Sequence, residues 1–144
     1  MKELLRDECL TLNQMETRKI VFYDGECGFC NRTVQFILNH EKSTVLYFCA
    51  LQSEKALMLF QQHGQPAPDM STFYFFDERF YSKSTAAIRL SGYLKSPYCL
   101  LRLLWVIPRF LRDAVYDFVA KRRQVLAAGF CALPTPEQGK RFIR

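Results

Sequence analysis

The sequence has little histidine and tryptophan and no long hydrophobic run. It contains two His residues and one Trp in 144 residues, although 15% are aromatic. A closed zinc site needs four nitrogen or sulfur ligands, which one Cys-x-x-Cys pair and two separate His residues hardly supply. His40 and His63 fall at predicted helix ends and need no catalytic role. The apolar stretches are far shorter than the roughly 20 residues that span a bilayer, so no transmembrane segment is expected.

The N-terminal segment 1–17 is polar and charged, without the basic and apolar regions of a signal peptide. We therefore expect a loose leader over 1–17, a single domain over 18–144, and a cytoplasmic location. A hydrophobic content of 49% suits one compact core. In a reducing compartment, a Cys-x-x-Cys pair is more often catalytic or metal-binding than structural.

The net positive charge is concentrated in the last third of the chain. Residues 95–144 hold ten Lys and Arg against three Asp and Glu, whereas residues 1–94 are nearly balanced. Such an excess of positive charge suggests nucleic acid or an anionic membrane as a partner. Because the basic residues are spread along an apolar helical pattern, we expect a solvated helix face and no nucleic acid.

The periodicity predicts an α/β protein with a βαβ-α-ββ-α core at about 18–95. The βαβ unit implies parallel strands, and a turn at Asp77-Glu78 implies a hairpin. We expect a four-stranded mixed sheet with helices on both faces. The predicted strands are Ile20–Tyr23, Thr44–Cys49, Thr72–Phe76 and Arg79–Tyr81; the predicted helices run from about Gly28 to His40, from Ser53 to Gln62, and from Ser82 or Ser84 to about Leu94.

Beyond this core, extra helices are predicted over about 97–130. The segments Tyr98–Ile107 and Phe110–Val119 are expected to dock their apolar faces on the domain and leave the basic heads in solvent. The expected buried stripe consists of Leu103, Leu104, Ile107, Leu111, Val115 and Phe118.

The pair Cys27 and Cys30 lies where the first strand turns into the first helix. Free N–H groups and the positive helix end favour a thiolate, so we expect a lowered pKa for Cys27. Cys27 is then the attacking nucleophile, and Cys30, three residues later, resolves the mixed disulfide. The alternative is half of a zinc site, since zinc knuckles use the same spacing.

The role of Asp24 near the pair stays open. Asp24 either relays protons to Cys30 or accepts loop N–H groups before the helix.

The order of elements, with the dithiol at the start of the first helix, resembles the thioredoxin fold. Enzymes of that fold usually place a cis-proline before the third strand; here either Pro68 fills that place or the element is missing. The segment 24–31, Asp-Gly-Glu-Cys-Gly-Phe-Cys-Asn, resembles the Asp-x-x-Cys-x-x-Cys signature of the DCC family of predicted thiol-disulfide oxidoreductases. The similarity continues through 51–54, 83–87, 112–116 and 131–136. It implies a thioredoxin-like fold and disulfide exchange without a cofactor. Cys131, in the last of these segments, is either a third redox thiol or a half-buried apolar residue.

Two functions follow as hypotheses. The first is a thiol-disulfide oxidoreductase that uses Cys27, Cys30 and Asp24 on a protein or small-molecule disulfide or thiol. The second is a non-catalytic binding module whose basic C-terminal helices hold a protein partner or an anionic surface.

Overall fold

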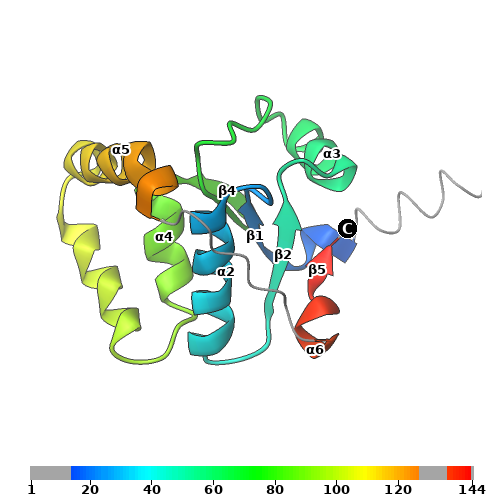
Figure 1. The fold of residues 1–144 in the computed structure, drawn as a ribbon, viewed down its shortest axis with the longest axis horizontal. Coiled ribbons are helices and arrows are strands. Elements are labelled where there is room, and N and C mark those ends of the chain that lie inside the picture. Colours follow the sequence, from blue (N-terminus) through cyan, green and yellow to red (C-terminus); the bar gives the residue numbers. More distant parts are fainter. Residues whose placement is uncertain (1–13, 127–135, 144) are drawn as a thin grey trace, which may run out of the picture.

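The protein is built on an open, five-stranded mixed sheet (Figure 1). The computed structural model describes residues 14–126 and 136–143. The central strand β1 (Lys19–Tyr23) pairs in parallel with β2 (Leu46–Ala50) and antiparallel with β3 (Tyr74–Asp77). A tight hairpin joins β3 to β4 (Arg79–Ser82), as predicted. The predicted mixed α/β class is confirmed, with strand bounds shifted by one or two residues.

The sheet has one strand more than the four predicted. The additional strand β5 (Phe142–Ile143) follows the short helix α6 (Pro136–Gly139) and pairs in parallel with β2 at the sheet edge. The adjoining Arg141 forms a buried ion pair with Glu41, and its Nε and Nη2 donate to the Leu46 carbonyl at 2.9 and 2.7 Å. Two residues are too short for a period-2 pattern, so these tertiary contacts define the strand.

Helices cover both faces of the sheet, as predicted. The helices α2 (Gly28–His40) and α4 (Lys83–Ser91) pack on one face, against Val21, Phe48 and Phe75. The helix α3 (Glu54–Gln62) packs on the other face, with Phe22 and Phe76. Successive strand side chains point to opposite faces, which sorts these aromatic residues into two cores. Met15, from the end of the predicted leader, is buried in the second core.

The C-terminal helices form as predicted but are turned the other way. The 3₁₀ helix η1 (Tyr98–Val106) leads into α5 (Arg109–Leu126), which lies over α4 and α2 (Figure 1). The expected buried stripe is wrong: most of its residues are exposed and Ile107 is half-buried. The exposed ones are Leu103, Leu104, Leu111, Val115 and Phe118.

The reason is that α5 is held by its polar face. Tyr116 accepts the Phe73 N–H through its hydroxyl oxygen at 2.8 Å, Ser84 donates to Asp113, and Lys83 pairs with Asp117 at 3.1 Å. These contacts turn the apolar side of the helix outward. Ser84 thus contacts α5, while the N-cap of α4 is Ser82, whose side chain makes no capping hydrogen bond.

Candidate functional site

Cys27 occupies the N-terminus of α2, where the sequence places it. Its backbone is extended, with φ −90° and ψ 118°, and its carbonyl accepts the first helical bond, from Asn31 N–H at 3.0 Å. The Cys27 side chain makes no capping hydrogen bond. Cys30 lies one turn into the helix; both cysteines are half-buried and are not joined in a disulfide. The helix end therefore presents the first thiol where partial positive charge is greatest.

A loop held by hydrogen bonds connects β1 to this helix. The Oδ1 atom of Asp24 accepts the Glu26 N–H at 3.0 Å and the side-chain amide of Gln52 at 2.6 Å. The Gln52 Oε1 atom accepts the Gly25 N–H at 3.2 Å, which closes the connection. Asp24 thus has the acceptor role that the sequence offered as one of its two alternatives; its action as a proton relay remains a prediction.

Gln52 is a site residue that the sequence reasoning did not single out. It follows β2, as Asp24 follows β1, and the two strands are parallel neighbours. Because the carboxyl ends of parallel strands meet at one edge of a sheet, the residues that follow them are brought together. This register was the information that could have identified Gln52.

An apolar pocket of about 280 Å³ lies beside Cys30. Its wall includes Asp24 and Phe29 from the dithiol segment, and Leu90 from α4. Tyr116, together with two smaller residues of α5, Val119 and Ala120, also lines it. Cys30 therefore faces an apolar surface, whereas Cys27 does not line this pocket.

The segment before β3 also lines this pocket, through Ser71, Thr72 and Phe73. Among the described residues the cis peptide bond is Ser96–Pro97, so Pro68 does not supply the cis-proline of one of our alternatives. Ser71 and Thr72 occupy the position before β3 at which a cis-proline is expected. The hydroxyl groups of both residues donate hydrogen bonds to the Asp69 carboxylate.

The remaining cysteines differ from the pair. Burial raises the pKa of the Cys49 thiol, although a hydrogen bond with Ser53 lowers it in part. This side chain is fully buried, as expected for a core residue. Cys99 is half-buried on η1, and both Cys9 and Cys131 lie outside the described residues. Within residues 14–126 and 136–143, no three His, Cys, Asp or Glu side chains are grouped so that they could hold a metal ion.

No helix in the described part of the chain is both long and apolar enough to cross a membrane.

A carboxyl group with a shifted pKa, Asp77 on β3, lies away from the dithiol. Burial raises the pKa of this carboxyl, but hydrogen bonds from Lys19 and Tyr93 outweigh it and lower the pKa below its ordinary value. This cluster ties β1 to β3 and does not line the pocket at Cys30.

Known proteins are similar to this chain over most of its length. The family model for DCC1-like thiol-disulfide oxidoreductases matches residues 21–128. The chain is 36% identical to an uncharacterized Bacillus subtilis protein, YuxK, over 93% of this chain and 99% of YuxK. It is 33% identical to a chloroplastic DCC family protein of Arabidopsis thaliana, over 77% of this chain and 66% of that protein. No solved structure matches. With the dithiol at the head of α2 and this match over most of its length, the chain belongs to the DCC1-like thiol-disulfide oxidoreductase family.

Proposed function

We propose that the protein is a thiol-disulfide oxidoreductase that acts through Cys27 and Cys30. The observation that carries the proposal is the position of Cys27 as the N-cap of α2, with its side chain outside the capping hydrogen bonds. The backbone N–H groups without helical partners and the positive end of the helix dipole lie at this place, and thiolates are the species that attack disulfides. The family match supports the same chemistry.

The reaction that we propose has two steps. The Cys27 thiolate attacks one sulfur of a substrate disulfide, forms a mixed disulfide and releases the other substrate sulfur as a thiolate. Cys30 then attacks the Cys27 sulfur and releases the second substrate thiolate. The enzyme dithiol loses two electrons and becomes a Cys27–Cys30 disulfide, while the substrate disulfide gains them. The reverse sequence oxidises a substrate dithiol.

Asp24 belongs to the proposal as the group that takes the Cys30 proton during resolution. It lines the same pocket as Cys30, and its Oδ1 atom is fixed by the Glu26 N–H and by Gln52. A positioned carboxylate of this kind can assist proton transfer.

The proposed substrates are protein or small-molecule disulfides and thiols, and the reaction requires no cofactor. The element order of the first four strands supports a thioredoxin-like description, to which β5 is an addition. A reducing compartment such as the cytoplasm suits a catalytic rather than a structural disulfide.

The test is to trap the mixed disulfide. Cys30→Ser should form a covalent complex with a disulfide-bonded substrate protein through Cys27, because the resolving thiol is missing. The complex should run as a larger species on a non-reducing gel and dissociate when dithiothreitol is added. Cys27→Ser should trap nothing and lose disulfide reductase activity.

Cys99→Ser is the matched control, because Cys99 is another half-buried cysteine, placed on η1. It should trap nothing and keep the activity of the parent protein. Full activity in Cys27→Ser, or one equivalent of zinc held by both thiols of the pair, would show that the proposal is wrong.

A further inference from the structure

The helix α5 packs with its polar side inward, which is the reverse of an ordinary surface helix. Its half-buried residues, Arg112, Asp113, Tyr116, Asp117 and Ala120, recur at three- and four-residue steps. The apolar residues between them face out: Phe110 is 77% exposed and Val115 is 61% exposed. A soluble surface helix normally shows the opposite arrangement, because exposed apolar area is costly.

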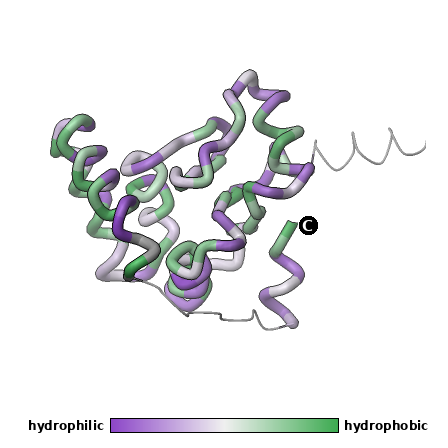
Figure 2. Tube along the Cα trace, turned by 45° about the horizontal axis from the view of Figure 1, so that its top comes forward, coloured by the Kyte–Doolittle hydropathy of each residue, from purple (hydrophilic) through white to green (hydrophobic). Residues whose placement is uncertain are grey.

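The preceding helix η1 continues this apolar surface. Leu103 is 69% exposed and Val106 is 86% exposed, and Pro108 joins η1 directly to α5. Figure 2 shows hydrophobic stretches along the outer edge of the molecule where these two helices lie. We call this region the outer face, defined by Leu103, Trp105, Val106, Phe110, Val115 and Phe118. A run of exposed large apolar side chains on this scale marks an interaction surface.

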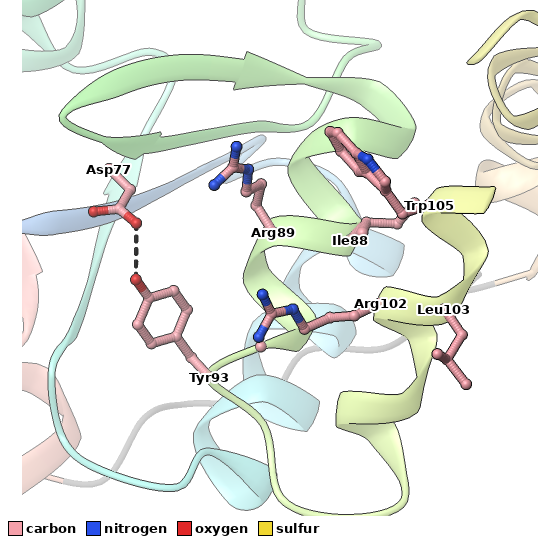
Figure 3. A pocket seen from close by; sticks show the side chains of 8 residues that line it. Asp77, Ile88, Arg89, Tyr93, Arg102, Leu103 and Trp105 are labelled. Carbon is pink, nitrogen blue, oxygen red and sulfur yellow. Dashed lines mark hydrogen bonds between the residues drawn. The ribbon is translucent and has the colours of Figure 1, made fainter. Parts of the chain in front are cut away.

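A basic cavity opens beside the outer face (Figure 3). It has a volume of about 730 Å³ and shares Leu103 and Trp105 with the outer face. Arg89 from α4 and Arg102 from η1 line it, and neither forms an ion pair with an acidic side chain of the described residues. The acidic residue in its wall, Asp77, forms an ion pair with Lys19 at 2.8 Å and acts on Arg89 through its charge, without an ion-pair contact. The Arg89 guanidinium lies 4.8 Å from the centre of the Tyr81 ring and 5.8 Å from that of Trp105. Aromatic rings do not neutralise a cation, so both guanidinium groups can attract an anion.

Positive charge is in excess around the outer face. Residues 98–126 carry six Lys and Arg against two Asp. The Arg122 guanidinium lies 4.4 Å from the centre of the Phe118 ring, so a cation is held directly against the apolar surface. Aromatic and aliphatic side chains rimmed by Arg and Lys are the pattern of a protein surface that lies in the headgroup region of a bilayer.

We propose that the outer face docks on an anionic phospholipid bilayer, with a lipid phosphate in the cavity between Arg89 and Arg102. Association with a second copy would bring the same excess of positive charge together from both sides, which is unfavourable. An anionic bilayer complements the charge and receives the apolar side chains at once. This function is separate from the dithiol chemistry, because Cys27 and Cys30 do not belong to the outer face.

Trp105 makes the test direct, because it is the chain's one tryptophan and belongs to the outer face. We would add the full-length protein to vesicles of phosphatidylcholine mixed with phosphatidylglycerol, and to vesicles of phosphatidylcholine alone. With the anionic vesicles, Trp105 emission should shift to the blue and become shielded from acrylamide, and the protein should sediment with the vesicles. Salt should weaken the binding, because it screens exposed charges.

Matched variants separate this surface from the rest of the molecule. Phe110→Asp should reduce binding at least tenfold, because it replaces an apolar side chain of the outer face with a negative charge. The substitution should cost little folding stability, since the Phe110 side chain is exposed. Leu57→Asp is the control, because it places the same charge at an exposed apolar position on α3. Arg102→Gln should weaken binding to anionic vesicles, and Arg79→Gln on the hairpin should not.

Three results would overturn the proposal. The first is no binding to anionic vesicles at low salt. The second is a dimer in solution that Phe110→Asp converts to a monomer, which would assign the outer face to a second copy. The third is that glycerol phosphate, added at the phosphate concentration of the vesicles, shifts the Trp105 emission and abolishes vesicle binding. The cavity would then be a site for a soluble anion.

Discussion

At the scale of single residues, Asp24 has one observed role and one proposed role, which mutation can separate. Its Oδ1 atom accepts two hydrogen bonds that hold the loop before Cys27, and its carboxylate lines the pocket at Cys30. An Asn side chain keeps an oxygen for the Glu26 N–H but cannot take a proton. Gln52→Ala removes the hydrogen bond to Asp24 and the one from the Gly25 N–H, and keeps the carboxylate.

Asp24→Asn should slow the resolution step by about 10²-fold, the size typical of a lost general base. In a single turnover with 5,5′-dithiobis(2-nitrobenzoate), the first thiolate released reports attack by Cys27 and the second reports resolution by Cys30. The variant should slow the second release far more than the first. Gln52→Ala should change both rates only slightly; equal slowing in the two variants would assign Asp24 to loop structure alone.

Asp77 is a second residue whose charge can be tested. Burial raises its pKa, but the hydrogen bonds from Lys19 and Tyr93 lower it more, so the folded-state pKa lies below the unfolded value. The stabilisation is therefore complete above the unfolded value of about 3.9 and is lost as the pH falls through the folded pKa.

Urea unfolding of the parent protein and of Asp77→Asn should show this dependence. The parent should be the more stable at neutral pH, and the difference should shrink below about pH 4, where the carboxyl becomes protonated. Glu78→Gln, at the exposed neighbouring position, is the control and should give a difference that hardly changes with pH. A constant difference for Asp77→Asn would contradict the role given to its charge.

Spacing and position were enough to place Cys27 at the start of a helix, Cys30 one turn later and Asp24 in the loop before them, because a dithiol after an apolar strand and before a helical pattern has few other arrangements. Gln52 required the pairing of β1 with β2, which is a tertiary fact. Tyr116 required the placement of α5, and its sequence surroundings indicated only a helix.

At the scale of elements, α5 shows how a correct periodicity can be given the wrong orientation. The helix and its apolar stripe were both predictable, and burial of the stripe followed from the ordinary rule for surface helices. The structure instead anchors the polar side through Tyr116, Asp113 and Asp117. Hydrogen-bond partners that lie 29 to 43 residues away in the chain do not appear in any local pattern.

In α5, a substitution on the polar side should therefore cost more stability than one on the apolar side, which is the reverse of the usual result for a surface helix. Tyr116→Phe should cost about 1–2 kcal/mol in the free energy of unfolding, because the Phe73 N–H loses its acceptor. Val115→Gln should change it by less than about 0.5 kcal/mol, since the side chain is exposed. Chemical denaturation measures both. A large loss in Val115→Gln would indicate that the apolar side of α5 is buried after all.

At the scale of the whole molecule, the sheet joins distant parts of the chain. The central strand order follows from the βαβ unit and the hairpin, which the sequence pattern contains. The fifth strand does not, because it depends on Arg141 meeting Glu41 across 100 residues. The carboxyl ends of β1 and β2 bring Asp24, Gln52 and the dithiol to one edge, α5 lines the pocket there, and its outer face remains available for a separate contact.

The most direct measurement is a redox titration of the intact protein in glutathione buffers, with the disulfides located by mass spectrometry. We predict one reversible disulfide between Cys27 and Cys30, formed in a two-electron transition in which the oxidised-to-reduced ratio changes tenfold per about 30 mV. Cys27→Ser should abolish it, and Cys99→Ser should leave it unchanged. If Cys27 and Cys30 were never joined, and carried only separate glutathione adducts, the account of a resolving dithiol would be contradicted.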